Sequence, residues 1–466
     1  MGNREWGMVG MVNRPPYSPF PPFPIPDCPF PRAGRGGGGK AGSQGGGRAA
    51  PRFSFTMLLP EIIRDPLWNN IRVDPHALQL VDTPVFQRLR YVRQLGLAYL
   101  VYPGATHTRF EHALGTYHLA RRTLGLLAER GDLGEIAPDE PAVVRAAALL
   151  HDVGHYPFSH ALEEIGALHH EAVARTLVTE GVAAAALREL IAPDAPERVY
   201  KLICGDSESP LQGLISGSLD LDKIEYLKRD ALMCGVPYGE IDVDRLLNAL
   251  TVVRDPRTGG PTVGVNEKGL SALESLLFAK YQMYRNVYWH HAVRSATAMY
   301  KRLVDDALRG GAIDERALAS FTDEGLLHTL EGSSGRSSLL KALRERRLYK
   351  RAYECVAEEL PQDGDWIAED PERSRAVEDE LATELDLEPG ELLLDFPVKP
   401  RMLGLDIPVQ QRDGSVRRLT MDGWPGAINL PLLSEQLYRT ARVFRVFVAR
   451  PVTLRPERVR ALMQQE

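Results

Sequence analysis

The sequence is poor in cysteine and has no long apolar run. Its four cysteines (Cys28, Cys204, Cys234 and Cys355) are scattered and include no CxxC pair. This excludes a disulfide framework and a zinc ribbon and suits a reducing compartment. No apolar stretch approaches the roughly 20 residues that span a bilayer, and no secretory signal precedes the folded region. We therefore expect a soluble, cytoplasmic protein.

The chain also lacks an excess of positive charge, because its net charge is -6 over 466 residues. Residues 1–56 carry seven Lys/Arg against Glu5 and Asp27, a net charge of +5 that leaves about -11 for the remainder. An acidic body argues against non-specific coating of nucleic acid as the main activity. It still allows a local basic cleft that holds a polyphosphate.

Composition divides the chain into an irregular beginning and a folded remainder. Residues 1–56 are rich in Pro and Gly, including the run Gly36–Gly39, and such a segment cannot bury enough apolar area to offset its ordering entropy. We predict that it is disordered. Met57 begins the first sequence typical of a folded protein, so the sequence leaves open whether residues 1–56 are translated.

Hydrophobic spacing predicts a mainly α fold with a helical core over residues 57–310. A helical linker and a smaller α+β C-terminal lobe would follow over residues 311–466. Asp82-Thr83-Pro84 is typical of a helix start, with a capping side chain before a proline. The predicted helices are one ending near Leu150 with Val143, Val144 and Ala147 on its apolar face, one or two over 270–308, and several over 314–388. The predicted strands are a hairpin over 252–265 and four C-terminal strands over 392–396, 403–409, 416–419 and 443–448, with a turn at Gly414.

Histidine is concentrated in one short window. Eight of the twelve histidines lie between residues 107 and 170, namely His107, His112, His118, His151, His155, His160, His169 and His170. The sharpest motif is His151-Asp152, where an apolar helix delivers an imidazole and a carboxylate side by side. A buried hydrogen-bonded pair is the usual explanation of a lone His-Asp dipeptide, but the surrounding histidines favour a metal site. Mixed nitrogen and oxygen ligands suit Mn, Fe, Co, Ni or Zn better than Ca, and such an ion polarises a phosphoryl oxygen and lowers the pKa of bound water.

A long ordered motif string resembles the deoxynucleoside triphosphate (dNTP) triphosphohydrolase branch of the HD superfamily, without the SAM domain that a human member carries. The string comprises Asp82-Thr83-Pro84, Gln87-Arg88-Leu89-Arg90, Gln94-Leu95-Gly96, Tyr102-Pro103-Gly104-Ala105-Thr106-His107, Arg109-Phe110-Glu111-His112 and the segment from His151 to His160. The resemblance covers roughly residues 61–305 and extends more loosely into the C-terminal lobe. It implies a dGTPase-like enzyme with a bound divalent metal ion, Mg included among the candidates.

The resemblance assigns roles residue by residue. It implies the metal ligands His112, His151, Asp152 and Asp222, with Asp220 as an alternative to Asp222. Three histidines, His155, His160 and His170, would surround the reacting phosphate and share proton transfer and charge stabilisation. Glu163 would orient one of them, and His169 and His170 could exchange roles. The implied substrate-binding residues are Gln94 and Leu95 at the sugar, Arg109, Lys223 and Lys280 at the triphosphate, Tyr226, Tyr284 and Tyr288 as pocket aromatics, and Asp230 near the sugar 3′-hydroxyl.

One departure concerns regulation. Asp82, Gln87 and Arg90 match residues of an effector-nucleotide site, but Glu61 stands where the family has a lysine. An acidic residue beside a polyphosphate is unfavourable. We therefore expect no activation by GTP and leave activation by a dNTP open. The resemblance also implies a homotetramer with effector sites between subunits.

The function predicted from these motifs is metal-dependent hydrolysis of dNTPs, dGTP among them, to deoxynucleoside and tripolyphosphate. One alternative is an HD-type phosphodiesterase or nucleotidase that acts on other phosphate esters. Another is a nucleotide-sensing regulator or single-strand binder with a decayed site. The complete set of expected ligands argues against decay.

Overall fold

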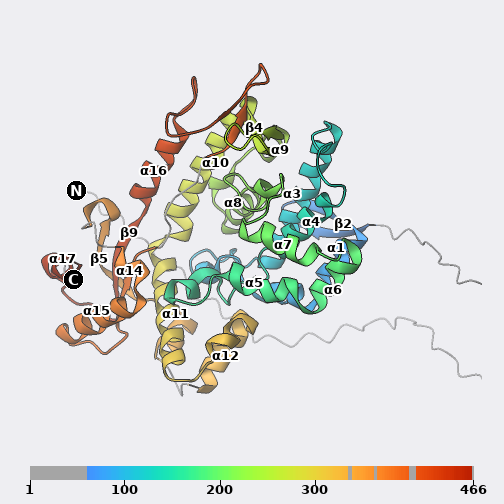
Figure 1. The fold of residues 1–466 in the computed structure, drawn as a ribbon. Helices are drawn as coiled ribbons and strands as arrows, with labels where there is room; N and C mark the ends of the chain where they lie inside the picture. Colours follow the sequence, from blue (N-terminus) through green and yellow to red (C-terminus); the bar gives the residue numbers. More distant parts are fainter. Residues whose placement is uncertain (1–59, 334–337, 361–364, 398–405, 464–466) are drawn as a thin grey trace, which may run out of the picture. The chain divides into compact units, whose positions relative to one another are not determined.

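Helices make up most of residues 60–333, 338–360, 365–397 and 406–463, the parts of the chain that the computed structural model describes (Figure 1). The predicted disorder of residues 1–56 lies outside them. The helices are α1 (Pro75–Val81), α2 (Pro84–Gln87), α3 (Arg109–Glu129), α4 (Glu140–Leu150), α5 (His170–Thr179), α6 (Gly181–Leu190), α7 (Ala195–Cys204), α8 (Leu221–Cys234), α9 (Val243–Ala249), α10 (Leu270–Met283), α11 (His291–Arg309), α12 (Asp323–Ser333), α13 (Ser338–Arg344), α14 (Trp366–Glu369), α15 (Pro371–Glu384), α16 (Leu430–Ala441) and α17 (Pro456–Met463). This confirms the predicted fold class of a helical core with a smaller α+β C-terminal region.

The helices α3, α4 and α8 pack together and carry the main hydrophobic core. A capping box starts α3, in which Thr108 and Glu111 satisfy each other's backbone amides. The predicted apolar face of α4 is confirmed, because Val143, Val144 and the other two named residues are all fully buried. That burial fixes the rotation of α4 about its axis, and this in turn sets the position of His151 and Asp152, which follow its C-terminal end.

The predicted helical stretch over 270–308 consists of two abutting helices. A π-helical turn, Tyr284–Tyr288, separates α10 from α11, and the His290 side chain caps α11 by accepting a hydrogen bond from the Ala292 amide. A π-turn places an extra residue in the helix and often occurs at functional sites. Two of the residues predicted as pocket aromatics, Tyr284 and Tyr288, are its first and last residues.

Strands form three small sheets. The first is a hairpin of β1 (Glu61–Asp65) and β2 (Asn69–Val73). The second has the order β3-β4-β7-β8, with bounds Leu250–Arg254, Pro261–Asn266, Pro408–Gln410 and Val416–Arg418, and β4 and β7 are parallel. The third has the order β5-β9-β6, with bounds Lys350–Val356, Val443–Val448 and Leu392–Asp395. The predicted hairpin and the strands near 392, 416 and 443 are confirmed, as is the turn at Gly414, whose φ is 87°.

A hairpin of β1 and β2, which the mostly helical expectation for the core did not specify, comes first among the described elements. Two local predictions were wrong. The region 314–388 is not helical throughout, since β5 pairs with β9 there. The Thr83 side chain does not cap α2; its hydroxyl donates to the Leu80 carbonyl at 2.6 Å instead. The first residues of the predicted strand at 403–409 lie outside the described residues, and β7 begins at Pro408.

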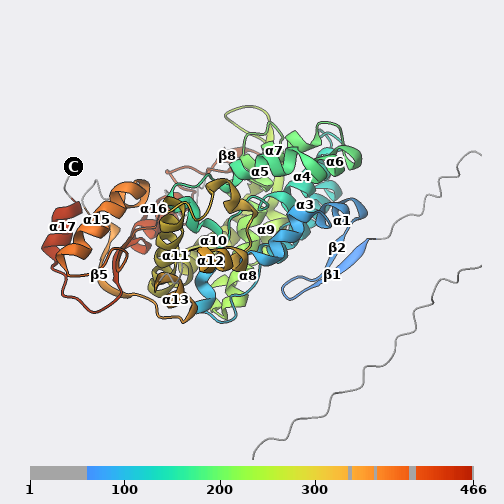
Figure 2. The same ribbon diagram turned by 90° about the horizontal axis from the view of Figure 1, so that it is seen from below.

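The helix α11 joins the helical core to the C-terminal sheet. It packs against the 3₁₀ helix Ser159–Ile165 on one side and against β5 and β6 on another (Figure 2). The domain boundary after residue 310 stays a prediction. Strands from both sides of it, β4 and β7, pair in one sheet.

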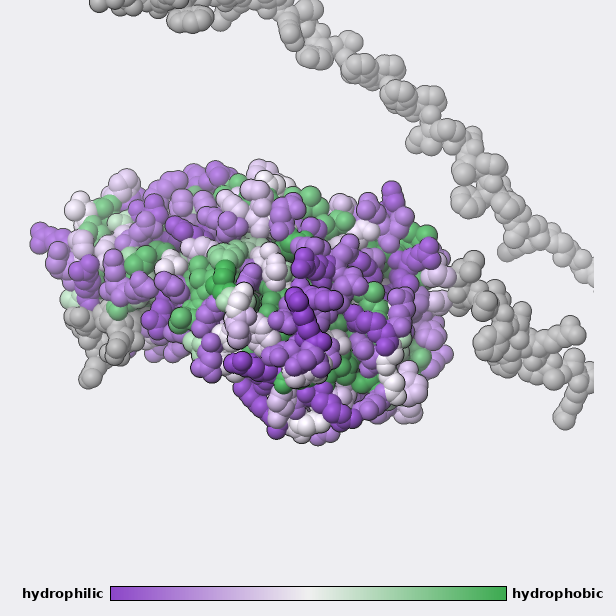
Figure 3. Space-filling view, turned by 90° about the horizontal axis from the view of Figure 1, so that it is seen from above, coloured by the Kyte–Doolittle hydropathy of each residue, from purple (hydrophilic) through white to green (hydrophobic). Residues whose placement is uncertain are grey.

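Polar and charged residues cover most of the face that Figure 3 shows, with apolar residues scattered among them. Within the described ranges no helix is both long and apolar enough to cross a membrane.

Candidate metal centre and active site

Three helix ends bring the four predicted metal ligands together. His112 lies in the first turn of α3, His151 and Asp152 directly follow α4, and Asp222 is the second residue of α8. His112 Nε2 lies 2.9 Å from Asp222 Oδ1 and 3.2 Å from His151 Nε2. The Asp152 carboxylate lies 3.6 Å from His112 Nε2 and 3.5 Å from His151 Nε2. The alternative ligand Asp220 instead caps α8 by accepting from the Lys223 amide at 2.9 Å.

These spacings fit a single divalent ion. Bonds of roughly 2.1 Å place neighbouring ligand atoms about 3.0 Å apart at right angles and about 3.4 Å apart at the tetrahedral angle. The separations among His112, His151 and Asp222 run from 2.9 to 3.5 Å, and Asp152 approaches the two histidines with different oxygens, at 3.6 and 3.5 Å. His112 is fully buried and Asp152 is 3% exposed, whereas the Asp222 side chain is 31% exposed. Two imidazole nitrogens and two carboxylates suit a first-row transition metal.

Glu225, which the sequence analysis missed, supports this cluster from behind. One of its oxygens lies 2.6 Å from His112 Nδ1. The other accepts from Trp68 Nε1 at 2.9 Å and from Arg229 Nε at 2.8 Å, and all of these groups are buried except the partly buried Trp68. A carboxylate behind a metal-binding histidine fixes the tautomer and the ring orientation. The signal was available, because Glu225 follows Asp222 by three residues and therefore shares its face of α8.

The electrostatics of the cluster favour a cation. Burial lowers the pKa of His112, but hydrogen bonds to Asp222 and Glu225 outweigh burial and raise it to about 10. Burial also raises the pKa of Asp152, yet Arg109 and the neighbouring histidines hold it well below its usual range. The carboxylates are therefore ionised, and their negative potential is directed at the buried imidazoles.

A second cluster contains the predicted catalytic residues His155, His160, Glu163 and His170, whose potential ligand atoms lie within 4.8 Å of one another. Asp152 Oδ1 lies 3.1 Å from His155 Nδ1, so the two clusters adjoin. Glu163 binds His170 Nδ1 at 2.8 Å and His160 Nδ1 at 3.3 Å. His169 lies at the edge of this arrangement, with its Nε2 3.7 Å from Glu163 Oε2 and a side chain 55% exposed.

Burial decides the protonation of two of these histidines. Burial, reinforced by Arg109, lowers the pKa of His155 well below its usual range. It lowers the pKa of His170 to about 4, although Glu163 opposes the shift. Both rings are therefore neutral near pH 7. With Nδ1 of each ring facing a carboxylate, Nε2 is the atom that carries the lone pair.

Arg109 lies between the two clusters. It is 3% exposed, and its guanidinium donates to Asp152 Oδ2 at 2.5 Å and to Ser159 Oγ at 3.1 Å. Lys223 is ion-paired with Asp220 and donates to the Gly217 carbonyl at 2.9 Å. Lys280 is 1% exposed and therefore buried rather than on the surface.

The predicted sugar-binding residues form a connected group. Tyr288 donates to Asp230 Oδ2 at 2.7 Å, and the other oxygen of Asp230 lies 2.7 Å from His107 Nε2. The ring of Tyr288 contacts those of Tyr226 and Tyr284, with centroids 6.4 and 4.8 Å apart. Tyr226 also lies 6.5 Å from the His112 ring, next to the metal cluster.

Gln94 and Leu95 lie on the loop that precedes the 3₁₀ helix Gly96–Leu100. Gln94 is 9% exposed, and its Oε1 has no hydrogen-bond partner within the described residues. A buried acceptor of this kind has a cost unless a ligand or water satisfies it. Leu95 is partly buried against the main core.

The residues assigned to an effector site lie apart from both clusters. Asp82 ends α1, and Gln87 donates to the Val81 carbonyl at 2.8 Å. Arg90 donates to Gln87 Oε1 at 2.8 Å and stacks 3.5 Å from the centre of the Phe110 ring. Glu61 belongs to β1, opposite Val73.

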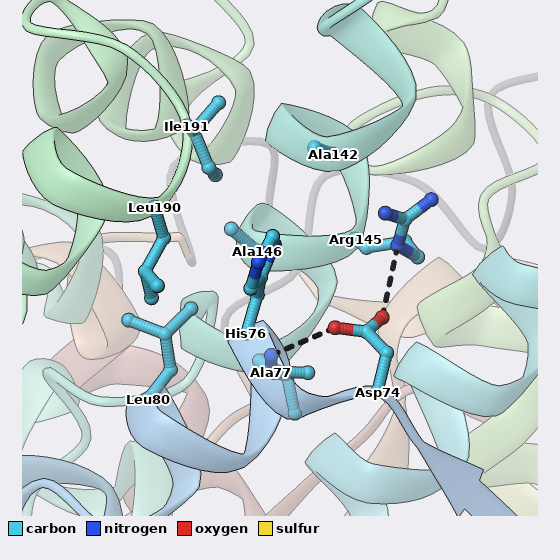
Figure 4. A pocket seen from close by; sticks show the side chains of 10 residues that line it. Asp74, His76, Ala77, Leu80, Ala142, Arg145, Ala146, Leu190 and Ile191 are labelled. Carbon is cyan, nitrogen blue, oxygen red and sulfur yellow. Dashed lines mark hydrogen bonds and ion pairs between the residues drawn. The ribbon is translucent and has the colours of Figure 1, made fainter. Parts of the chain in front are cut away.

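A small cavity between α1, α4 and α6 contains none of the predicted site residues (Figure 4). Its volume is about 20 Å³, which is room for about one water molecule. Apolar side chains line most of it, and Asp74 pairs with Arg145 Nε at 3.4 Å at its edge. It is too small for a nucleotide.

Comparison with known proteins agrees with this geometry. Residues 109–227 match the HD domain, and residues 241–422 match the HD associated region. An uncharacterized protein of Methanocaldococcus jannaschii is 36% identical over 291 residues, 62% of this chain and 59% of that protein. A Dictyostelium discoideum homolog of the dNTP triphosphohydrolase SAMHD1 is 28% identical over 66% of this chain and 64% of its own length. The chain thus spans less than two thirds of these relatives. A hypothetical protein from Aquifex aeolicus superposes with a TM-score of 0.64 at 28% identity, covering 87% of this chain and all of that one.

Proposed function

Because the chain contains an HD domain, we propose that this phosphohydrolase uses a divalent metal ion to hydrolyse dNTPs, dGTP included, to deoxynucleoside and tripolyphosphate. The observation that carries the proposal is the cluster of His112, His151 and Asp222, with the Asp152 carboxylate 3.5–3.6 Å from both imidazoles, beside three further histidines. The similarity to a SAMHD1 homolog supports a dNTP as the substrate. Homo-oligomerisation, an effector nucleotide and a cytoplasmic location belong to the same proposal.

The ion would be held by the four ligands, and when bound it would polarise the α-phosphoryl group and make water more acidic. In the hydrolysis, a water oxygen forms a bond to the α-phosphorus while the bond from that phosphorus to the sugar O5′ breaks. The water loses a proton and O5′ gains one. The tripolyphosphate leaves from one side and the deoxynucleoside from the other.

The chain's own residues would move those protons and stabilise the charge. His155 is neutral and its Nδ1 faces Asp152, so Nε2 is oriented to accept a proton. His160 lies 3.5 Å from it and is held by Glu163, which suits proton delivery to O5′. Arg109 is positioned to counter the charge that develops on the phosphate oxygens. Gln94, Tyr288 and Asp230 would bind the sugar.

Hydrolysis of each dNTP, alone and in mixtures, with Mn²⁺ and identification of both products tests the proposal. We expect deoxynucleoside and tripolyphosphate in equal amounts. The double variant His151→Ala/Asp152→Ala should lose the activity. The matched control His328→Ala removes an exposed histidine far from the cluster and should keep it. Absence of nucleoside release from every dNTP, with several metals, would refute the proposed function.

The second histidine cluster supports one alternative. If His155, His160, Glu163 and His170 held another ion, the site would match a two-metal phosphodiesterase or nucleotidase. Elemental analysis of the purified protein distinguishes the two, because one ion per chain supports the triphosphohydrolase and two support the alternative.

A further inference from the structure

The turn that carries the candidate catalytic histidines has an unfavourable backbone conformation. Phe158 and Ser159 lie between His155 and His160, and both have positive φ angles, 57° and 65°. Residues with a side chain rarely adopt the left-handed region, and two in succession persist only where surrounding contacts enforce them. The contacts that hold this turn therefore decide where the imidazoles of His155 and His160 lie.

Asp323, the first residue of α12, supplies those contacts. Its Oδ1 accepts from the Phe158 amide at 2.8 Å, and its Oδ2 accepts from the Arg93 amide at 3.0 Å. Its side chain is 2% exposed, so water does not compete for these bonds. Arg93 Nη1 lies 3.4 Å from the same carboxylate and supplies a balancing positive charge. One buried carboxylate thus ties the catalytic turn to the strand-like segment before Gln94.

Neighbouring contacts join the same two segments. The Ser159 hydroxyl lies 2.7 and 2.9 Å from the carbonyls of Arg93 and Gln94. The Arg88 guanidinium donates to the His155 carbonyl at 2.6 Å and to the Phe321 carbonyl at 3.1 Å. Phe321 stands two residues before Asp323. The start of α12 therefore contacts the turn directly through Asp323, and Phe321 is linked to the neighbouring His155 carbonyl through Arg88, although both residues lie outside the matched HD domain of residues 109–227.

A close approach of Gly96 shows how tightly the turn is packed. A Cβ atom added at Gly96 would lie 2.8 Å from the Phe158 carbonyl oxygen, and Gly96 itself has φ of 52°. The Phe158 residue is therefore packed against Gly96 through its carbonyl and bonded to Asp323 through its amide.

We propose that Asp323 is a positioning residue that holds the turn Phe158–Ser159 and thereby places His155 and His160 for phosphate ester hydrolysis. The inference rests on the proposed function only for the roles of the two histidines. The position of the turn itself can be measured without any substrate. Asp323 touches no reacting atom, so its effect is on geometry alone.

The test compares Asp323→Asn with Glu324→Gln. Asparagine has nearly the same shape but replaces one acceptor oxygen with an amide that cannot accept, so one of the two backbone bonds is lost. Glu324 is the next residue, is 56% exposed on its side chain and pairs with Arg344, so its loss serves as the matched control. Assays belong at a pH well above 6, because burial raises the pKa of Asp323 to about 6.

We expect Asp323→Asn to lower kcat by about 10–100-fold, as small displacements of catalytic groups do. KM and the bound metal content should stay near the wild-type values, which a general loss of structure would not allow. Hydrogen exchange followed by mass spectrometry should show faster exchange in the peptide containing Phe158. Glu324→Gln should change none of these quantities.

The outcomes separate the two proposals. An active wild-type enzyme with an unchanged kcat in Asp323→Asn would overturn the inference and leave the proposed function standing. A wild-type protein that hydrolyses no dNTP refutes the proposed function, and the exchange comparison still decides the inference. If Asp323→Asn does not fold, the wild-type protein suffices, because rapid exchange of the Phe158 amide would contradict the buried bond to Asp323.

Discussion

Replacement of Gly115 by alanine should weaken the candidate metal site through Glu225. Gly115 lies on α3, one turn beyond His112. A Cβ atom at this position would lie 1.9 Å from Glu225 Oε1, 2.6 Å from its Cδ and 2.9 Å from Arg229 Nη2. Cβ contacts below 3.0 Å are essentially never seen, so the carboxylate would have to withdraw by about 1.1 Å, the difference between 3.0 and 1.9 Å.

That withdrawal has a calculable cost. The Glu225 carboxylate is fully buried and bonds to His112, Trp68 and Arg229 at 2.6–2.9 Å. Losing two charge-assisted bonds costs about 3–6 kcal/mol, at about 1.5–3 kcal/mol each. Replacing a helical glycine with alanine stabilises the folded state by about 1 kcal/mol. The net loss of unfolding free energy should therefore be about 2–5 kcal/mol. Disturbing the support of a metal-binding histidine should also weaken metal binding about 10–100-fold.

Gly125→Ala on the same helix is the matched control, because a Cβ atom there meets nothing within 4 Å. It should stabilise the protein by up to about 1 kcal/mol and leave metal binding unchanged. Urea unfolding of the metal-free proteins measures the first effect, and titration with Mn²⁺ measures the second. If Gly115→Ala matched Gly125→Ala in both measurements, the supporting role of Glu225 would be refuted.

Two further predictions concern pH and metal removal. Burial raises the pKa of Glu378 to about 7 despite bonds from the Leu394 amide and Arg302, so its folded pKa exceeds its ordinary value of 4.5. Its contribution to the free energy of unfolding is then full below pH 4.5 and is lost as the pH rises through 7. Over that range, urea unfolding should show the free energy of unfolding of the wild-type protein falling by about 2–3 kcal/mol relative to that of Glu378→Gln. Parallel pH profiles for the two proteins would contradict this. Chelation of the bound metal by EDTA should lower the melting temperature, and adding Mn²⁺ at about 100 times its Kd should restore about 2.7 kcal/mol of unfolding free energy. The variant His151→Ala should respond to neither treatment. An equal response in that variant would place the ion elsewhere.

The helical core and the His151-Asp152 motif were predictable because they depend on local patterns. The apolar face of α4 is visible in the sequence, and the His151-Asp152 pair follows it directly. Asp222 came from the resemblance, and the structure brings it and His112 within reach of His151. The spacing over 270–308 predicted helix but left open whether there is one helix or two, and the π-turn that divides them left no mark in it.

The supporting contacts were harder to predict because the partners are distant in sequence, and for Glu225 the only local signal was its position three residues after Asp222. Glu225 lies 113 residues from His112, and Asp323 lies 165 residues from Phe158. A single sequence carries no record of such contacts, and a buried acidic residue is indistinguishable from an exposed one on a helix face. The strand β5 was missed for the same reason, since its pairing with β9 joins segments almost a hundred residues apart.

The helix α8 carries four residues of the candidate site. Asp222 faces the metal cluster, Glu225 supports His112, and Tyr226 and Asp230 belong to the tyrosine group at the candidate sugar pocket. A helix moves as one body with a rise of about 1.5 Å per residue, so a slide or rotation that relaxes one contact displaces all four. If α8 holds the proposed ion and sugar sites, ion affinity and sugar binding are mechanically linked, and substitutions in the packing beneath α8 should alter both together.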